Sequence, residues 1–147
     1  PYFANINKRL VKTPKLYFYD TGLLCYLLGI ENVQQLKTHP LRGSIFENMV
    51  LNEVLKNRFN QGKDNNLCFY RENKGSEVDL VSPQSNKLSI MEIKSAKTFT
   101  KDFMRGIKHL EDLLGENIVR SCVVYDGDLE SPILMRGIYN FRNISDF

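Results

Sequence analysis

No stretch of this 147-residue sequence is long and apolar enough to span a lipid bilayer. The longest apolar run, at residues 23–30, is far shorter than the roughly 20 residues that a transmembrane helix needs. A basic segment followed by an apolar one, which marks a classical export signal, is also missing from the N-terminal region. These absences predict a protein that needs no membrane, and we expect it to work in the cytoplasm.

Ligands for soft metals are scarce in the sequence. The three cysteines, Cys25, Cys68 and Cys122, show no CxxC spacing and lie among apolar neighbours. An odd number of such residues indicates buried free thiols in a reducing compartment rather than disulfides or a zinc site. His39 and His109 have no partners at metal-ligand spacing. A net charge of only +3 is compatible with a nucleic-acid partner but does not require one.

The size and composition are those of an ordinary globular protein with one main domain. Hydrophobic residues make up 42% of the sequence and charged residues 25%, which fits a chain with a normal core. No repeat or low-complexity tract occurs, but the character of the sequence changes near residue 40. We therefore expect residues 1–40 to form a helical appendage and residues 41–147 the main domain. Pro1 at the first position favours a piece of a longer protein.

Apolar periodicity and turn residues divide the chain into helices and strands. Asp20 is placed to cap the first helix and Gly29 to end it, after an extended entry at residues 15–20. The predicted helices cover residues 21–29, 31–37, 43–60 and 102–114, and the predicted strands cover residues 67–72, 76–81, 87–94, 118–126 and, at an edge, 135–141. From residue 43 the order is helix, three-stranded antiparallel meander, helix and strand, which predicts an α/β fold.

Charged residues recur at alternating positions in the second and third predicted strands. Because alternate side chains of a strand share a face, Glu77, Asp79 and Val81 should point one way. Glu92 and Lys94 share a face of the next strand. The midpoint between Asp79 and Glu92 falls in the predicted turn, so these carboxylates should lie opposite each other, about 5 Å apart at their Cβ atoms. Either Lys94 or a divalent cation must offset their repulsion.

The helix at residues 43–60 contributes a third carboxylate. Its apolar stripe includes Val50, Val54 and Phe59, and Glu47 lies at the edge of that stripe. Glu47 should therefore face the sheet and approach the two strand carboxylates. Because burying unpaired charge is costly, such a cluster is typical of a site where a metal ion or a substrate supplies the compensating charge.

Glu47, Asp79 and the Glu92-Ile93-Lys94 triplet together resemble the PD-(D/E)xK signature of restriction-endonuclease-like phosphodiesterases. The order of elements agrees with the core of that superfamily, although Val78 stands where the signature has proline. The segments KLYFYDTGL, GSIFENMVLNEVL, YRENKGSEVDLV and MEIKSAK also resemble the uncharacterised C-terminal domain attached to prokaryotic AAA-type ATPases. This second resemblance covers nearly the whole chain. In that family an ATPase module comes first, and since no P-loop motif occurs here we expect no ATPase activity from this chain.

The resemblance implies a divalent-metal site with hydrolytic activity on DNA. Asp79 and Glu92, with the Ile93 carbonyl, would hold Mg²⁺ or Mn²⁺, and Glu47 would assist directly or through water. Lys94 would position or deprotonate the attacking water. Asp79, Glu92 and Lys94 are thus the implied catalytic residues.

Other interpretations of these residues stay open. A charged hairpin is often only a solvated surface, and an ATPase-linked domain could keep an acidic pocket for docking or regulation without catalysis. Lys97, Lys101, Arg105 and Lys108 form a basic stripe that could bind phosphates, as could Arg71, although such a stripe is also typical of a solvated helix face. The expected partners are DNA and the ATPase module of the same chain, and assembly into a homo-oligomer is left open.

Overall fold

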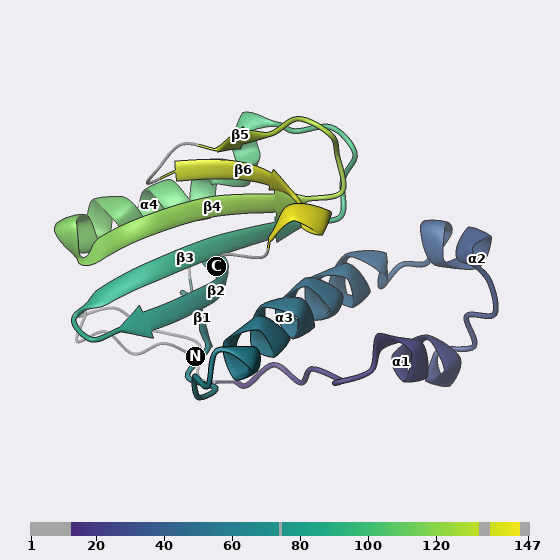
Figure 1. Ribbon diagram of the computed structural model, residues 1–147. Helices are drawn as coiled ribbons and strands as arrows, with labels where there is room; N and C mark the ends of the chain where they lie inside the picture. Colours follow the sequence, from purple (N-terminus) through teal and green to yellow (C-terminus); the bar gives the residue numbers. More distant parts are fainter. Residues whose placement is uncertain (1–12, 74, 133–135, 145–147) are drawn as a thin grey trace.

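A six-stranded sheet forms the centre of the molecule, in a computed structural model that describes residues 13–73, 75–132 and 136–144. The strands are β1 (Cys68–Arg71), β2 (Glu77–Gln84), β3 (Lys87–Lys94), β4 (Ile118–Tyr125), β5 (Ser131–Pro132) and β6 (Arg136–Asn140). They lie in the order β1-β2-β3-β4-β6-β5. The long helix α3 (Arg42–Asn60) covers one face of the sheet, and α4 (Arg105–Leu114) covers the other (Figure 1). The fold is therefore a mixed α/β arrangement, as expected from the sequence.

The first three strands form the predicted antiparallel meander. β1 pairs with β2, and β2 pairs with β3. Gln84 pairs with Lys87, which leaves Ser85 and Asn86 as a two-residue turn in place of the longer turn predicted at residues 82–87. Ser85 has a φ of 55°, the left-handed conformation that tight hairpin turns need. Both strands are consequently paired almost up to the turn.

A crossover connection joins β3 to β4. These two strands are parallel, and their connection passes through the 3-10 turn η1 (Lys101–Met104) and α4. β6 pairs parallel with β4, so β4 lies between β3 and β6. The prediction of an edge strand at residues 135–141 is wrong for residues 136–140, because the short β5 pairs with the outer side of β6. Residue 135 lies outside the described residues.

Two apolar cores fill the spaces between the sheet and its helices. Val50, Leu51 and Val54 of α3 pack against one face, and Ile107 and Leu110 of α4 pack against the other. The sheet residues include Leu80, Met91, Ile93, Cys122 and Val124 on the α3 side, and Val78, Val81, Leu88, Ile90 and Val123 on the α4 side. Because each fully buried aliphatic side chain contributes roughly 1.5–3 kcal/mol, these contacts hold both helices on the sheet.

The apolar stripe predicted for α3 is confirmed at Val50 and Val54 but is wrong at Phe59. The two valines are fully buried, whereas Phe59 is 50% exposed. Arg58 takes the inward position near the end of the helix, where its guanidinium donates hydrogen bonds to the Ser82 hydroxyl and the Asp64 carbonyl. A guanidinium has five donors and finds several acceptors here, so this end of α3 packs through polar contacts.

The three cysteines are free thiols, as predicted. Cys122 is buried on the α3 side of the sheet, and burial raises the pKa of its thiol to about 12. Cys25 and Cys68 are only half-buried, so the prediction of burial is wrong for them. Because the thiolate is the reactive form, Cys122 is unsuited to nucleophilic or redox chemistry.

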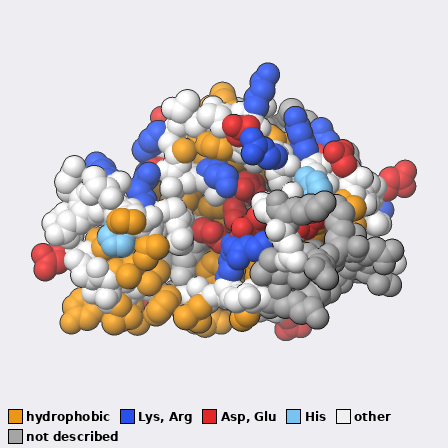
Figure 2. All heavy atoms as spheres, turned by 180° about the vertical axis from the view of Figure 1, so that it is seen from behind, with side chains coloured by type: hydrophobic (Ala, Val, Ile, Leu, Met, Phe, Trp, Pro, Cys, Tyr) orange, Lys and Arg blue, Asp and Glu red, His pale blue; other side chains and the backbone are white. Residues whose placement is uncertain are grey.

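Two short helices, α1 (Thr21–Leu27) and α2 (Val33–Thr38), form an arm beside α3 (Figure 1). Asp20 caps α1 as predicted, since its side chain accepts hydrogen bonds from the amides of Gly22 and Leu23. Apolar side chains gather over this part of the surface in Figure 2. Residues 1–12 of the predicted appendage lie outside the described residues. Within the described ranges, none of the helices has the length and apolar character of a membrane-spanning segment.

Candidate functional site

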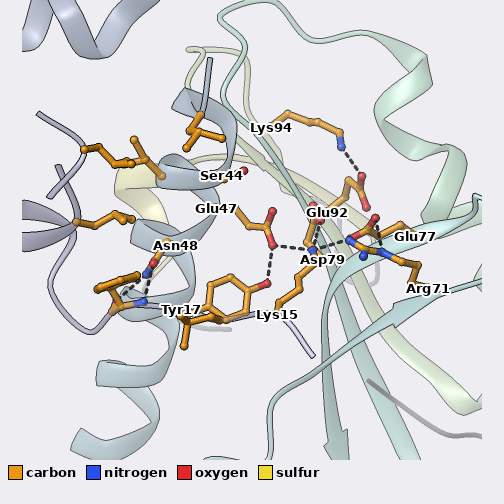
Figure 3. Close-up of a pocket in the computed structure, with 16 residues that line it drawn as sticks. Lys15, Tyr17, Ser44, Glu47, Asn48, Arg71, Glu77, Asp79, Glu92 and Lys94 are labelled. Atoms are coloured by element: carbon orange, nitrogen blue, oxygen red, sulfur yellow. Dashed lines mark hydrogen bonds and ion pairs between the residues drawn. The ribbon is translucent and has the colours of Figure 1, made fainter. Parts of the chain in front are cut away.

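Four of the residues expected to form a metal site, Glu47, Asp79, Glu92 and Lys94, line one cavity, whereas Ile93 is not among its lining residues and has its side chain in the core. The cavity has a volume of about 550 Å³ and lies between α3, the meander and the extended segment that precedes α1. Glu47 reaches it from α3, Asp79 from β2, and Glu92 and Lys94 from β3 (Figure 3). Figure 2 shows acidic side chains gathered at a hollow in this surface, with basic side chains beside them. The structure thus brings three distant carboxylates and one ammonium together.

Asp79 enters the cavity because β2 does not alternate regularly. Cys68 pairs with Val81 but Tyr70 pairs with Val78, so β2 holds one more residue than β1 over this interval. A bulge of this kind re-aims the side chains next to it. Val78 and Val81 both pack in the core on the α4 side, whereas Asp79 lines the cavity. The prediction that Val81 shares a face with Asp79 is therefore wrong, because simple alternation does not anticipate a bulge.

The pairing of β2 with β3 holds Asp79 beside Glu92. The ladder ends at the pair Leu80 and Met91. The same register, continued one step outward, would set Asp79 opposite Glu92, which is the arrangement that the sequence predicts. The Oδ2 atom of Asp79 accepts a hydrogen bond of 2.8 Å from the Ile93 amide. This side chain therefore replaces a main-chain partner at the point where the ladder stops.

The two carboxylate oxygens of Glu92 have different surroundings. Oε1 accepts a hydrogen bond of 2.5 Å from the Lys94 ammonium. Oε2 is buried and has no hydrogen-bond partner among the described residues. The first turn of α4 packs closely against this position, since a Cβ atom on Gly106 would lie 3.5 Å from Glu92 Oε2 and 2.0 Å from the Glu77 carbonyl oxygen. Glu92 is thus enclosed from the α4 side while one of its acceptors remains unused.

The negative charge of Asp79 and Glu92 is poorly compensated. Burial, together with the charge of Glu47, raises the pKa of Asp79 to about 6 despite the hydrogen bond from the Ile93 amide. Burial and the charge of Asp79 raise the pKa of Glu92 to about 7, although Lys94 acts in the opposite direction. A pair of acids that resists ionisation near neutral pH is where an added cation would be stabilised most.

A lysine that sequence reasoning missed occupies the other end of the cavity. Lys15 Nζ lies 2.9 Å from Glu47 Oε1, 2.5 Å from Glu77 Oε1 and 3.7 Å from Asp79 Oδ1. Burial lowers the pKa of Lys15, but the hydrogen bonds to Glu77 and Glu47 outweigh it and leave the pKa above its usual value. Lys15 is therefore an ammonium ion at neutral pH. No periodic pattern signals its contact with Glu47, because the two residues are 32 positions apart.

The extended segment that carries this lysine is anchored to α3 by polar side chains. The Tyr17 hydroxyl donates a hydrogen bond of 2.6 Å to Glu47 Oε1. Asn48 accepts from the Phe18 amide at 2.8 Å and donates to the Phe18 carbonyl at 2.7 Å, and Asn52 donates to the same carbonyl at 2.8 Å. Asn48 and Asn52 are both buried. Two amides four residues apart on the buried side of a helix were the available signal for this contact.

Arg71 belongs to the same network. Its Nε atom donates to Glu77 Oε2 at 3.0 Å, and a second nitrogen donates to Glu77 Oε1 at 2.8 Å. Burial alone would raise the pKa of Glu77, but the hydrogen bonds from Arg71 and Lys15 bring it below its usual value. Arg71 was predicted to contact nucleic acid, and it does line the cavity, with its guanidinium engaged by a carboxylate.

The other predicted nucleic-acid contacts lie on the exterior. Lys97 and Arg105 are exposed and form ion pairs with Asp126 and Asp102 respectively. Lys101 is exposed in η1. None of these three side chains lines the cavity, and their role in binding DNA stays a prediction.

Residues 42–143 match a family described as a domain of unknown function, DUF4143. The chain belongs to the DUF4143 family. Residues 1–34 match a second domain of unknown function, DUF8612. This DUF4143 chain is similar to uncharacterised proteins of Mycobacterium bovis and Mycobacterium tuberculosis, each 33% identical over 133 residues. The matched region is 90% of this chain but 28% of each relative, so the chain spans less than a third of their length. No solved structure matches it.

The acidic cavity of this DUF4143 domain has the donor chemistry that hard divalent cations prefer. Carboxylate oxygens of Asp79 and Glu92 and the carbonyl oxygen of Ile93 are ligands of the kind that bind Mg²⁺ and Mn²⁺. The unused acceptor Glu92 Oε2 fits such an ion. Within the described ranges, no group of three or more His, Cys, Asp or Glu side chains is arranged to hold a metal ion. An ion here would therefore take part of its ligand set from the main chain and from water.

Proposed function

We propose that this DUF4143 domain is a divalent-metal-dependent DNA phosphodiesterase with a restriction-endonuclease-like core, carried at the end of a longer AAA-type ATPase chain. The observation that supports it most is the buried, unpartnered oxygen of Glu92, a residue that lines the cavity together with Asp79 and Lys94. Support for the ATPase context comes from the resemblance of the sequence and from relatives that are much longer than this chain.

The proposed reaction is hydrolysis of a phosphodiester. The oxygen of water forms a bond to phosphorus, and the bond from phosphorus to one sugar oxygen breaks. The water gives up a proton to solvent, and the departing sugar oxygen takes one up from solvent, so the products are a phosphomonoester and an alcohol. Asp79, Glu92 and the Ile93 carbonyl would hold Mg²⁺ or Mn²⁺, which supplies positive charge for the charge that develops on the phosphate. Glu47 would assist through its remaining oxygen or through water.

Lys94 has the role of positioning the water or the phosphate. Burial lowers the pKa of Lys94, but the charge of Glu92 and their hydrogen bond outweigh it and leave the pKa above its usual value. An amine that stays protonated donates hydrogen bonds and attracts anions, but it does not accept a proton from water. Of the two roles predicted from the sequence, positioning is therefore favoured over deprotonation.

A second candidate is a catalytically inactive docking, regulatory or nucleic-acid-binding domain of the same ATPase. The observation that favours it is Lys15, because an ammonium already lies among three of the carboxylates and supplies part of the positive charge that a metal would provide. This candidate predicts no affinity for divalent metals.

The two candidates are separated by nuclease assays on duplex, single-stranded and branched DNA with Mn²⁺, Mg²⁺ or EDTA. We expect cleavage by the wild type only with metal, and a loss of roughly a hundredfold or more in Asp79→Asn and Glu92→Gln, as for loss of one electrostatic contact in an active site. Glu53→Gln is the matched control, because Glu53 is an exposed carboxylate on α3 paired with Lys56. Absence of both metal binding and cleavage in the wild type would favour the docking domain.

A further inference from the structure

We propose that Lys15 is a built-in counter-cation that takes the place of a second divalent ion, so that the cavity binds a single divalent cation at its Asp79–Glu92 end. This inference rests on the proposed metal site and specifies how many ions it takes. It also assigns the extended segment before α1 to the site itself.

The geometry around Lys15 is that of an occupied cation position. Carboxylate oxygens from α3 and β2 converge on its ammonium, with Glu47 at 2.9 Å, Glu77 at 2.5 Å and Asp79 at 3.7 Å. An ammonium has three donor hydrogens and no acceptor, so it can serve several carboxylates at once. The side chain is only 16% exposed, and the ammonium also lies 5.3 Å from the centre of the Phe69 ring. Lys15 is therefore enclosed, unlike a surface lysine that samples water.

The path of the chain fixes this position. Asn48 holds the main chain of Phe18 from both its amide and its carbonyl, and Asn52 adds a further hydrogen bond to that carbonyl. Tyr17 binds the same Glu47 oxygen as the ammonium, at 2.6 Å. These contacts place Lys15 relative to α3 through buried hydrogen bonds, which are costly to break because each leaves an unpaired polar group.

The two ends of the cavity differ in how well their oxygens are satisfied. At the Lys15 end, Glu47 Oε1 accepts two hydrogen bonds and both oxygens of Glu77 are bonded to Arg71, one of them also to Lys15. At the other end, Glu92 Oε2 is buried and unpartnered among the described residues. An added cation would gain most at Glu92, and it would meet the charge of Lys15 at the opposite end.

The formal charges of the cavity also favour a single divalent ion. Among the described residues that line the cavity, the four carboxylates Glu47, Glu77, Asp79 and Glu92 face the three cations Lys15, Arg71 and Lys94. With all of them ionised, one negative charge is left over. One divalent ion would change the net charge of the cavity from −1 to +1, which suits an anionic phosphodiester. Two ions would leave a net charge of +3 in a partly buried space.

The test counts bound ions and does not depend on catalysis. Mn²⁺ is titrated into the protein, and the free ion is measured by electron paramagnetic resonance. We expect one ion per chain for the wild type and two for Lys15→Ala, in which Glu47, Glu77 and Asp79 lose their ammonium. Lys15→Arg, which keeps the charge, and Lys56→Ala, which removes an exposed lysine paired with Glu53 on α3, should both bind one.

A second measurement uses the wild type alone, in case Lys15→Ala does not fold. Reductive methylation followed by mass spectrometry should modify Lys15 more slowly than the exposed Lys56, both without and with saturating Mn²⁺. If Mn²⁺ brings the rate at Lys15 up to that at Lys56, the ion displaces the ammonium and the inference is overturned.

The remaining outcomes separate this inference from the proposed function. One ion in both the wild type and Lys15→Ala would overturn the role of Lys15 and leave the metal site intact. Two ions in the wild type would have the same meaning. No ion in either protein would overturn the metal-dependent function, and the inference with it.

Discussion

Acidification should stabilise the metal-free protein, which is the opposite of what salt-bridged carboxylates usually produce. The pKa of Asp79 is about 6 and that of Glu92 about 7 in the folded chain. In the unfolded chain both return to about 4. Between these values the folded state binds more protons than the unfolded state. The free energy of unfolding therefore decreases as the pH rises through this window and increases as the pH falls.

The expected size follows from the pKa differences. Each unit of pKa difference corresponds to about 1.4 kcal/mol. For Asp79, the difference between a pKa of about 6 in the folded chain and about 4 in the unfolded chain therefore corresponds to roughly 3 kcal/mol. The two groups do not add, because the pKa of Glu92 already includes the charge of Asp79 and the first proton removes much of their repulsion. We expect on the order of 3 kcal/mol between pH 8 and pH 5. For a chain of this length, that is a rise of roughly 6–12 °C in melting temperature.

Thermal unfolding in EDTA, followed by circular dichroism from pH 8 to pH 5, measures this effect. Glu92→Gln is the key comparison, because it replaces the acid by a neutral group of the same shape. It should melt above the wild type at pH 8 and show a weaker dependence on pH. Other groups titrate in both proteins, so only the difference between them counts. If the two proteins show the same pH dependence, the carboxylates are not held at raised pKa and the reasoning fails.

Two further predictions concern the packing around the cavity. Gly106→Ala should destabilise the protein by about 1–3 kcal/mol in urea unfolding, because its Cβ atom would lie 2.0 Å from the Glu77 carbonyl oxygen and the neighbours must shift. Gly43→Ala, also in a helix but with only Ser95 nearby at 3.9 Å, should be neutral or slightly stabilising, and equal effects of the two changes would contradict the close approach of α4. Asn48→Ala should cost about 1–3 kcal/mol and speed hydrogen exchange at the Phe18 amide; unchanged exchange there would show that α3 does not anchor the segment.

Regular geometry predicted part of the acidic site, although the entry of Asp79 into the cavity also depends on the bulge in β2. Helical spacing directs Glu47 towards the sheet, and the symmetry of a hairpin brings Asp79 and Glu92 to the same end of the β2–β3 ladder whether the turn has two residues or six. The orientation of Val81 could not be predicted, since one extra residue in β2 reverses the alternation beyond it. Helical spacing alone predicted Phe59 in the core. The buried residue is instead Arg58, whose guanidinium donates a hydrogen bond to the Ser82 hydroxyl on a distant strand.

The contribution of Lys15 could not be predicted for a different reason. Its segment forms neither helix nor strand, so no periodicity tells which way its side chains point. Its partners Glu47 and Glu77 lie on separate elements, brought to it only by the folding of the whole domain. Sequence patterns report local geometry, and a cation that binds across elements is a property of the assembled structure.

The grip of Asn48 and Asn52 on the extended segment acts only on the main chain of Phe18 and Tyr19. Peptide groups are the same in every residue except proline, so these hydrogen bonds do not depend on the side chains of the residues that they bind. Substitutions at positions 18 and 19, apart from proline at position 18, should therefore leave these hydrogen bonds in place, and with them the path of the chain to Lys15, three residues before Phe18. The charge in the cavity is thus positioned by the path of the main chain, and these hydrogen bonds place no demand on the side chains at positions 18 and 19.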